Sequence, residues 1–229
     1  MFSKDEYAII VAGGMGNRMG KSSPKQFLLL SGKPVLMYSV HAFHDYNPYI
    51  QVVVALHPDY FETWGKLCNE YDFQQSHRLV PGGETRYHSV KNALDAITGE
   101  GFVSVHDAAR PLVSKALISS TFGEARKYSN AIPAIPVNET VRTIESGYPR
   151  LVDRNSLRII QTPQVFEINM LKRAYQQKYQ PSFTDDASLL EAQGVHLHLV
   201  EGDLRNIKIT YPCDLDIAEA YLKSATDKE

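Results

Sequence analysis

The segment from Ala12 to Gln26 combines glycines with cationic side chains at a spacing that suits phosphate binding. Three glycines lie within four residues of one another: Gly13, Gly14 and Gly16. They let the backbone turn sharply and bring its N–H groups close to an anion. Arg18 and Lys25 add two positive charges. Because the segment follows an apolar run that is typical of a buried strand, we predict that it binds nucleotide phosphates at the edge of an α/β sheet.

Two well-known phosphate loops do not fit this segment. A Walker A loop would end correctly at Gly20-Lys21-Ser22, but its required first glycine falls on Met15. A dinucleotide fingerprint that begins at Gly14 would need a third glycine where Met19 stands. The segment therefore belongs to neither class.

A second segment with chemical potential reads His-Asp-Ala-Ala-Arg-Pro over residues 106–111, at the end of an apolar run. Asp107 at the end of a strand could hold Mg²⁺ or a substrate hydroxyl, and Arg110 could bind a phosphate through two hydrogen bonds. A purely structural interpretation, in which Asp107 caps the next helix and pairs with Arg110, is equally compatible with this segment alone.

A third segment, residues 81–90, is a glycine turn that leads into a predicted helix. Gly82 and Ser89 are its candidate ligand contacts, because backbone N–H groups at a helix N-terminus bind polar and anionic groups. Thr85 in the same segment is also a plain helix cap, so this segment alone does not establish a site.

These segments are positioned by alternating strands and helices. Short, β-branched apolar runs predict buried strands at residues 7–12, 50–56, 102–105 and 131–137. Helical patterns occupy residues 34–43, 59–69, 85–97 and 115–127. This alternation predicts a single Rossmann-like α/β domain over residues 1–229, with a mainly parallel sheet.

Residues 138–157 break the alternation. Two β-prone stretches flank a turn that contains glycine and proline, which predicts a β-hairpin. The hairpin is too polar for the core, so we expect it to project from the body as an arm. Further helices are expected at residues 169–178, 185–193 and 212–223, with a strand at 195–200.

The composition excludes several classes of protein. A formal net charge of -2 argues against binding to duplex nucleic acid, which favours a basic excess. Two distant cysteines, Cys68 and Cys213, argue against a disulfide framework or a zinc site. The absence of a long apolar run or signal peptide predicts a cytoplasmic protein that does not bind a membrane.

The pattern Gly-x-Gly-x-Arg-Met followed by Pro-Lys-Gln resembles the signature loop of the sugar-phosphate and polyol-phosphate nucleotidyltransferases. Three more motifs extend the likeness over nearly the whole chain: Asp153-Arg154-Asn155, Gln161-Thr162-Pro163-Gln164 and Asn206-Ile207-Lys208-Ile209-Thr210. Together they resemble the 2-C-methyl-D-erythritol 4-phosphate cytidylyltransferase family. The ribitol-5-phosphate cytidylyltransferases share the loop, but they usually have His-Asp-Ser-Val-Arg-Pro at residues 106–111 and lack Asp-Arg-Asn.

The resemblance implies transfer of CMP from CTP to a polyol phosphate, with Mg²⁺ as cofactor and a homodimer formed through the arm. It implies that the nucleotide is bound by Ala12, Gly13, Gly14, Met15, Gly16, Gly82 and Ser89. It assigns the catalytic cations as Arg18, Lys25 and Lys208. It assigns substrate binding to Asp107, Arg110, Thr140 and Arg154, with Asp107 also a candidate metal ligand and the last two acting in the partner subunit's site.

The chemistry agrees with such a set of residues. A phosphomonoester has its second pKa near about 6, so it is already mostly dianionic at neutral pH and needs no general base. Three alternatives stay open at this point. They are a transferase for another polyol phosphate such as ribitol 5-phosphate, a non-catalytic nucleotide-binding protein, and a glycosyltransferase with its metal at Asp214 and Asp216, although helix capping explains that acidic pair better.

Overall fold

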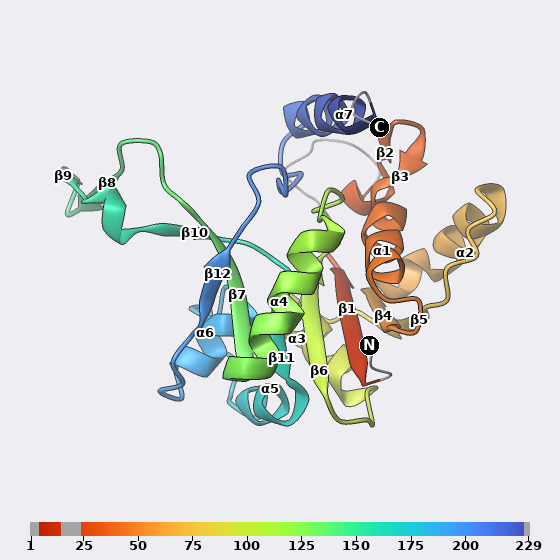
Figure 1. Ribbon diagram of the computed structural model, residues 1–229, viewed down its shortest axis with the longest axis horizontal. Coiled ribbons are helices and arrows are strands. Elements are labelled where there is room, and N and C mark those ends of the chain that lie inside the picture. Colours follow the sequence, from red (N-terminus) through yellow and green to blue (C-terminus); the bar gives the residue numbers. More distant parts are fainter. Residues whose placement is uncertain (1–4, 15–23, 227–229) are drawn as a thin grey trace.

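A central sheet of eight strands organises residues 5–14 and 24–226, the part of the chain that this computed structural model describes. Its strands are β1 (Glu6–Ala12), β4 (Gln51–Leu56), β5 (Arg78–Pro81), β6 (Phe102–Asp107), β7 (Asn130–Pro136), β10 (Arg158–Ile160), β11 (Gln164–Glu167) and β12 (Leu199–Glu201). They are ordered β10-β7-β11-β6-β1-β4-β5, and β12 pairs with β7 off this path (Figure 1). The predicted strands at residues 7–12, 50–56, 102–105 and 131–137 are thereby confirmed.

The strand order places a ligand crevice at β1. This strand pairs in parallel with β4 on one side and with β6 on the other, and β4 pairs in parallel with β5. The chain therefore winds outward from β1 in both directions, and such a switch point leaves a crevice at the carboxyl ends of the two adjacent strands. Ala12 ends β1 and Asp107 ends β6, so the sequence-predicted segments meet at this edge.

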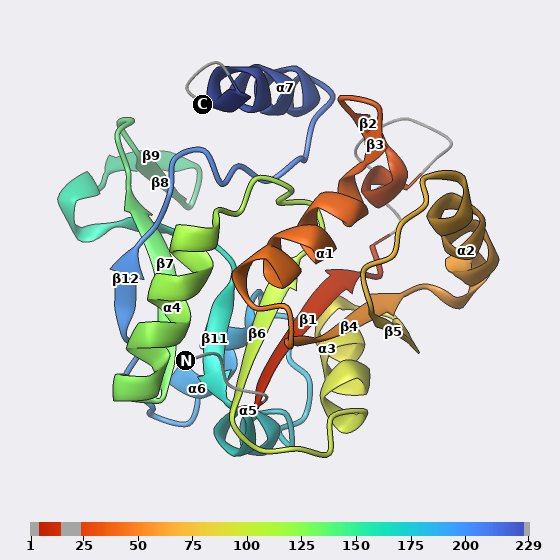
Figure 2. The same ribbon diagram turned by 45° about the vertical axis from the view of Figure 1, so that its right-hand side comes forward.

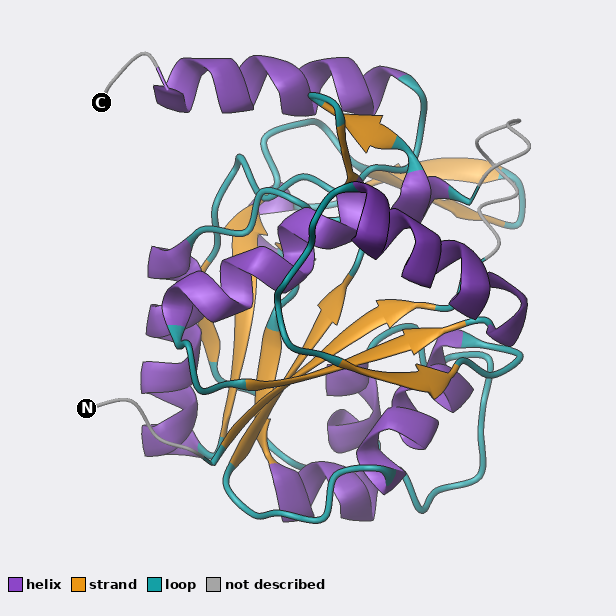
Figure 3. Cartoon of the chain, turned by 90° about the vertical axis from the view of Figure 1, so that its right-hand side faces the viewer, coloured by secondary structure: helices purple, strands orange, loops and turns teal. Residues whose placement is uncertain are grey.

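Helices cover both faces of the sheet, which explains why its central strands are continuously apolar. The helices are α1 (Val35–Tyr46), α2 (Phe61–Glu70), α3 (Arg86–Asp95), α4 (Lys115–Tyr128), α5 (Ile168–Ala174), α6 (Asp186–Glu191) and α7 (Cys213–Thr226). One apolar cluster joins the sheet to α1, α2 and α4, and a second joins it to α3, α5 and α6. Figure 2 shows α1 and α4 on the same face, and Figure 3 shows the strands fanned between helical layers.

The antiparallel part of the sheet was not expected from the sequence. Strand β11 lies between β6 and β7 and runs antiparallel to both, and β10 pairs with β7 in the same sense. Short strands β2 (Leu29–Leu30), β3 (Lys33–Pro34) and β5 were also not predicted. These strands have two to four residues each, too few for a clear alternation of side chains. The sheet as a whole remains mainly parallel, as predicted.

The predicted hairpin within residues 138–157 is confirmed as a separate two-stranded sheet, β8 (Arg142–Glu145) and β9 (Tyr148–Leu151). Ser146 and Gly147 form its turn with φ of 51° and 84°, the sign at both positions that matches a two-residue hairpin turn. Every residue of the two strands is exposed, and the hairpin projects away from the sheet at the left of Figure 1.

The carboxyl-terminal helix α7 lies at the top of Figure 1, beside β2 and β3. A third apolar cluster joins it to β2 and to the start of α1 through Leu30, Val35 and Ala218. Among the described helices there is no apolar segment long enough to span a bilayer.

Candidate active site

A cavity of about 720 Å³ opens at the carboxyl ends of β1, β4, β5 and β6. Eight of the sequence-predicted site residues line it: Ala12, Gly13, Gly14, Lys25, Gly82, Ser89, Asp107 and Lys208. They come from five separate stretches of the chain, and the parallel strand ends bring them to one edge. The structure thus assembles most of the predicted nucleotide and catalytic residues around one space.

A second cavity of about 600 Å³ adjoins the first on the side of β11 and α6. Its lining includes Arg110 and Thr162, and it shares Arg86, Asp107 and Lys208 with the first cavity. The three shared side chains therefore stand where the two cavities meet. Two ligands bound in the two cavities would contact each other at this point.

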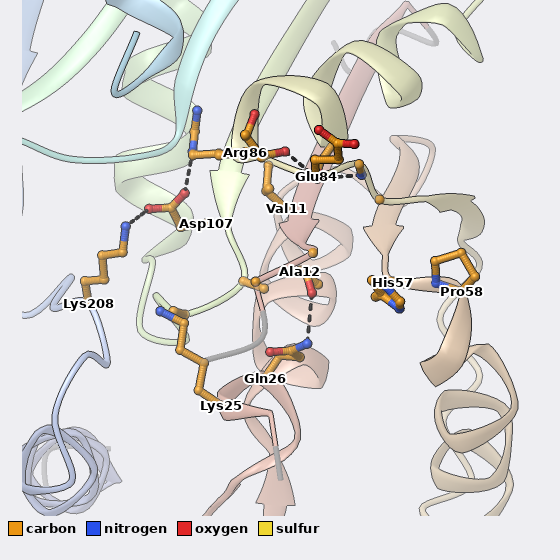
Figure 4. A pocket seen from close by; sticks show the side chains of 18 residues that line it. Val11, Ala12, Lys25, Gln26, His57, Pro58, Glu84, Arg86, Asp107 and Lys208 are labelled. Carbon is orange, nitrogen blue, oxygen red and sulfur yellow. Dashed lines mark hydrogen bonds and ion pairs between the residues drawn. The ribbon is translucent and has the colours of Figure 1, made fainter. Parts of the chain in front are cut away.

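The shared residues form one charged cluster (Figure 4). Lys208 Nζ lies 2.6 Å from Asp107 Oδ2, and Arg86 Nε lies 3.1 Å from Asp107 Oδ1. Burial alone would raise the pKa of the Asp107 carboxyl, but the charges of Arg86 and Lys208 hold it well below its ordinary value. Asp107 is consequently ionised at neutral pH. The next helix, α4, is capped by Ser114, and the ion-pair partners of Asp107 are Arg86 and Lys208, so the interpretation of Asp107 as a helix cap paired with Arg110 is wrong.

Lys208 is held over Asp107 by the residues on either side of it. Asn206 is fully buried and donates its side-chain amide to the backbone oxygen of Thr162, at 2.8 Å. The buried Ile209 donates its backbone N–H to the oxygen of Ala109, at 2.8 Å. The segment Ile207-Lys208 is thus held at both ends, while the side chain of Lys208 stays 41% exposed in the cavity.

Asp107 is positioned from behind by Thr162 and His106. Thr162 Oγ1 accepts the backbone N–H of Asp107 at 3.0 Å, and its hydroxyl lies 3.1 Å from His106 Nδ1. His106 Nε2 lies 3.0 Å from the backbone oxygen of Arg110, which can only accept. The proton of the imidazole is therefore on Nε2, and Nδ1 accepts from the threonine hydroxyl. Burial lowers the pKa of His106 to about 4, which keeps the ring neutral.

The segment that contains Pro-Lys-Gln is tied directly to β1. Gln26 is buried and donates its side-chain amide to the backbone oxygen of Ala12, at 2.9 Å. Lys25 begins a short 3₁₀ turn, Lys25–Phe27, and is thereby placed beside the end of the strand. The hydrogen bond of Gln26 thus connects the Pro-Lys-Gln motif to the end of β1, and this connection places Lys25 in the cavity.

At the other end of the first cavity, the glycine turn after β5 packs closely on the loop after β1. A Cβ atom on Gly82 would lie 3.4 Å from the Cα of Gly13. Ser89 Oγ accepts the backbone N–H of Gly83 at 3.0 Å and donates to the oxygen of Thr85 at 3.0 Å. Thr85 caps α3 by accepting the N–H of His88, so the structural interpretation of this residue as a helix cap is confirmed.

Arg110 is buried beside the second cavity. Its Nη1 donates to the backbone oxygen of Asn206 at 2.7 Å. Within the described part of the chain, Arg110 Nε and Asn206 Oδ1 are buried without a hydrogen-bond partner. Buried polar atoms rarely lack a hydrogen-bond partner. These two atoms can therefore still form hydrogen bonds next to the cavity.

Three predicted residues, Met15, Gly16 and Arg18, lie outside the described part of the chain. Two others, Thr140 and Arg154, are exposed at the base of the arm and line neither cavity. Asp153 caps the short turn Arg154–Ser156, and Arg154 donates to the backbone oxygen of Asn138. The structure of one chain therefore does not bring these two residues to Asp107.

Sequence reasoning missed Arg86 and Asp186. Arg86 lies at the first position of α3, where a positive charge opposes the helix dipole, and this mismatch is a signal that the charge serves another purpose. Asp186 follows Asp185 at the start of α6, where either carboxylate could serve as the helix cap. The structure assigns the cap to Asp185, which accepts from Ser188 N at 3.0 Å, whereas Asp186 is fully buried and pairs with Arg86.

The donor set fits Mg²⁺ only in combination with substrate phosphates. Among the described residues, no three His, Cys, Asp or Glu side chains are grouped to bind a metal ion. A single carboxylate, Asp107, stands where the two cavities meet, and Mg²⁺ is commonly held by one or two carboxylates together with substrate phosphates and water. Asp214, the second residue of α7, accepts the backbone N–H groups of Thr210 and Tyr211 at 2.7 and 2.8 Å, so its carboxylate ties the preceding segment to the start of the helix.

Comparisons with known proteins agree on one family. A family model described as 2-C-methyl-D-erythritol 4-phosphate cytidylyltransferase matches residues 7–224. The protein of that name from Bacteroides fragilis is 49% identical over 215 residues, which cover 94% of this chain and 98% of the relative. The one from Bacteroides thetaiotaomicron is 46% identical, covering 93% and 98%. The crystal structure of the Thermus thermophilus protein of that name has a TM-score of 0.76 and 32% identity, covering 94% and 98%.

Proposed function

The chain belongs to the 2-C-methyl-D-erythritol 4-phosphate cytidylyltransferase family, and we propose that its two adjoining cavities are the sites for CTP and for the acceptor. It is a cytidylyltransferase that transfers CMP from CTP to 2-C-methyl-D-erythritol 4-phosphate in the non-mevalonate route to isoprenoid precursors. The first cavity, at the glycine turns, takes CTP, and the second, beside Arg110, takes the polyol phosphate.

The observation that carries this proposal is the set of side chains shared by the two cavities. Arg86, Asp107 and Lys208 line both. In the reaction an oxygen of the acceptor phosphate forms a bond to the α-phosphorus of CTP, and the bond from that phosphorus to the bridging oxygen breaks to release pyrophosphate. Two anions must therefore meet at one point, and cations at that point reduce their repulsion.

Lys25 and Lys208 are the proposed cations for the α-phosphate, with Arg18 from the glycine loop as the third. Lys25 lines the first cavity beside the end of β1, and Lys208 stands at the junction. Their contribution is orientation of the two phosphates and stabilisation of the charge that develops on the leaving pyrophosphate. Gly82 and Ser89 lie at the far end of the same cavity and are the proposed contacts of the nucleoside.

The acceptor enters as a dianion, so its attack needs no group to remove a proton. The arrangement around His106 supports this mechanism. Although His106 is adjacent to Asp107, both of its ring nitrogens are engaged by Thr162 and by the backbone oxygen of Arg110. His106 therefore shapes the site and does not act as a base in it. Asp107 and Arg110 are the proposed contacts of the acceptor's hydroxyl and phosphate groups.

Mg²⁺ is the proposed cofactor, held by the phosphates of CTP and by Asp107. When bound, it would neutralise charge on the triphosphate and on the departing pyrophosphate. Asp107 already pairs with two cationic groups, so its carboxylate would bind Mg²⁺ only if Lys208 moved aside. Titration of activity with Mg²⁺ after treatment with a chelator tests this role.

The arm is the proposed dimer contact. Three of its large apolar side chains are more than two-thirds exposed, Ile144 at 69%, Tyr148 at 75% and Leu151 at 68%. Three exposed apolar side chains on a two-stranded hairpin indicate that another chain packs against this hairpin. In such a dimer Thr140 and Arg154 would reach the partner's acceptor site.

The nucleotide assignment is tested by ³¹P NMR of reactions with CTP, UTP or ATP and the same acceptor. We expect a new pair of diphosphate-diester resonances, with equimolar pyrophosphate, only with CTP. Equal product from UTP would contradict the assignment of Gly82 and Ser89 to cytosine selection. Nucleotide binding without any product on this acceptor would instead support a non-catalytic protein.

A further inference from the structure

Arg86 lies between two carboxylates that face different parts of the protein. Its Nε donates to Asp107 Oδ1 at 3.1 Å in the active site, and its Nη2 donates to Asp186 Oδ2 at 2.7 Å behind it. The second oxygen of Asp186, Oδ1, accepts the hydroxyl of Tyr175 at 2.6 Å. The chain of contacts therefore runs from Tyr175 through Asp186 and Arg86 to Asp107.

Asp186 is buried in a way that fixes its partners. Its side chain has no exposed surface, so its charge has to be compensated by protein groups. Arg86 and Tyr175 provide this compensation with one hydrogen bond to each oxygen. Burial alone would lower the pKa of the Arg86 guanidinium, but the two carboxylates, Asp186 foremost, raise it well above its ordinary value. The guanidinium is thus permanently charged and held at both ends.

The elements behind Arg86 are packed into one apolar cluster. The ring of Tyr87, the next residue on α3, stacks on the ring of Tyr175 with centroids 4.8 Å apart. The hydroxyl of Tyr87 donates to the backbone oxygen of Tyr175 at 3.0 Å. Ala187 and Leu190 of α6 are buried in the same cluster. A close-packed interior of this kind does not allow the Asp186 carboxylate to move far.

The two cations on Asp107 are consequently unequal. Lys208 is 41% exposed and its ammonium ends a flexible chain, with the Asp107 carboxylate as its ion-pair partner. Arg86 is 25% exposed and is anchored from behind. An incoming phosphate can attract the lysine away from Asp107, whereas the anchored arginine stays in place.

We propose that Asp186, supported by Tyr175, is a positioning residue that anchors Arg86 so that Asp107 keeps its orientation when Lys208 leaves it for the substrate phosphates. This inference rests on the proposed roles of Asp107 and Lys208 in CMP transfer. Asp186 itself reaches no ligand, and its effect passes through Arg86.

Two substitutions test the anchor, Asp186→Asn and Tyr175→Phe. The first removes the charge that holds Arg86, and we expect kcat to fall about a hundredfold because a misplaced group at a reacting centre has effects of that size. The second removes one hydrogen bond to a charged group, and we expect a fall of about tenfold. In both variants the KM for CTP should stay within about twofold of the wild type, because the nucleoside contacts at Gly82 and Ser89 are unchanged.

A matched control exists on the other side of the sheet. Glu6 is also a buried carboxylate, and it accepts hydrogen bonds from Arg126 and from the hydroxyl of Tyr46. Tyr46→Phe and Glu6→Gln therefore make the same kinds of change as Tyr175→Phe and Asp186→Asn, but at a site away from the cavities. They should lower the unfolding temperature by amounts comparable with Tyr175→Phe and Asp186→Asn and leave kcat within about twofold of the wild type. Equal losses of kcat in both pairs would overturn the proposal.

The background Arg86→Gln separates positioning from general stability. If Asp186 acts through Arg86, adding Tyr175→Phe to Arg86→Gln should lower kcat no further. The same tenfold loss in both backgrounds would show that Tyr175 and Asp186 act by supporting the fold and would overturn the proposal.

A measurement that requires no turnover keeps this inference separate from the proposed function. In ¹⁵N NMR spectra of the free protein, the Nε–Hε resonance of Arg86, assigned by its loss in Arg86→Gln, should show restricted motion. Its order parameter should fall in Asp186→Asn and not in Glu6→Gln. An unchanged resonance in Asp186→Asn would overturn the anchor whatever the activity. A wild type that released no pyrophosphate would overturn the proposed function and leave this readout valid.

Discussion

Lys208 and Asp107, 101 positions apart in the sequence, form an ion pair with their charged atoms 2.6 Å apart. The pair lies at the junction between the two cavities, where the two substrates are proposed to meet. We propose that the lysine leaves the carboxylate when a substrate phosphate arrives and brings its charge to that phosphate. Arg86 and Lys208 together keep the pKa of Asp107 low, so its carboxylate is ionised.

Replacement of this lysine should reduce catalysis far more than it reduces stability. We predict that Lys208→Ala lowers kcat by about a hundredfold or more, because a lost contact to the developing charge has effects of that order. Lys25→Ala should behave similarly. Steady-state assays of pyrophosphate release measure both losses.

Lys223→Ala is the control for that prediction, since Lys223 lies in the last turn of α7 and lines neither active-site cavity. It should retain full kcat. If Lys208→Ala kept more than about a tenth of wild-type turnover, the assignment of this lysine to the α-phosphate would be wrong.

The glycine turn after β5 should be sensitive to a single methyl group. A Cβ atom on Gly83 would lie 2.3 Å from the Cβ of His88 and 2.9 Å from its carbonyl carbon, which is backbone and cannot rotate away. The turn would have to open, and the bond from Gly83 to Ser89 would be lost. We predict that Gly83→Ala raises the KM for CTP about tenfold.

Gly123→Ala provides the comparison, because a Cβ atom on this glycine of α4 would meet nothing within 4 Å. Isothermal titration with CTP distinguishes the two variants. Wild-type affinity in Gly83→Ala would show that the nucleoside does not depend on this turn.

His106 should stay neutral in the folded chain at any pH well above 4. Its pKa is about 4 in the folded chain and 6.5 in the unfolded one, so the unfolded chain takes up a proton first as the pH falls. The associated stability is fully present above pH 6.5 and is lost as the pH falls from 6.5 to 4. Between pH 7 and pH 5 we expect the free energy of unfolding to decrease by about 2 kcal/mol.

Urea unfolding at the two pH values measures this decrease, to which His77 contributes with the same sign because burial also lowers its pKa. The ¹⁵N shifts of the His106 ring isolate the individual group. They should show a proton on Nε2 and none on Nδ1 at pH 6. Titration of this ring near pH 6.5 would refute the hydrogen-bond assignment at Thr162.

The arm prediction concerns two chains at once. If Arg154 completes the partner's site, a mixture of inactive Arg154→Ala and Lys25→Ala subunits should regain activity, because each heterodimer contains one site with both residues intact. After complete exchange of subunits, half of the dimers should be heterodimers. If subunit exchange is demonstrated and no activity returns, Arg154 lies outside the reacting site.

Much of the fold could be predicted because its signals are local. The buried strands are continuous apolar runs, and the arm has a turn at Ser146 and Gly147 that its own residues specify. The insertion of β11 between β6 and β7 could not be predicted in this way. Strand order is set by packing between distant segments, and β11 has only four residues, too few for a recognisable strand pattern.

The site was predictable to the same extent. Gly13, Gly14 and Asp107, which line the first cavity, were predicted as site residues from their types and from their place at strand ends. Arg86 and Asp186 were not, because their contact joins residues 100 positions apart and neither lies in a spacing that a single sequence reveals. The role of Thr162 as the link between His106 and Asp107 likewise appears only when β11 is placed beside β6.

The most direct test of the account is the specificity constant of the wild-type protein for a panel of phosphorylated acceptors with CTP and Mg²⁺. The panel should contain 2-C-methyl-D-erythritol 4-phosphate, ribitol 5-phosphate and a phosphomonoester without a polyol chain. We predict that pyrophosphate release with methylerythritol phosphate exceeds that with ribitol 5-phosphate at least about a hundredfold in kcat/KM, the equivalent of two well-placed contacts. An equal or higher value for ribitol 5-phosphate would contradict the account.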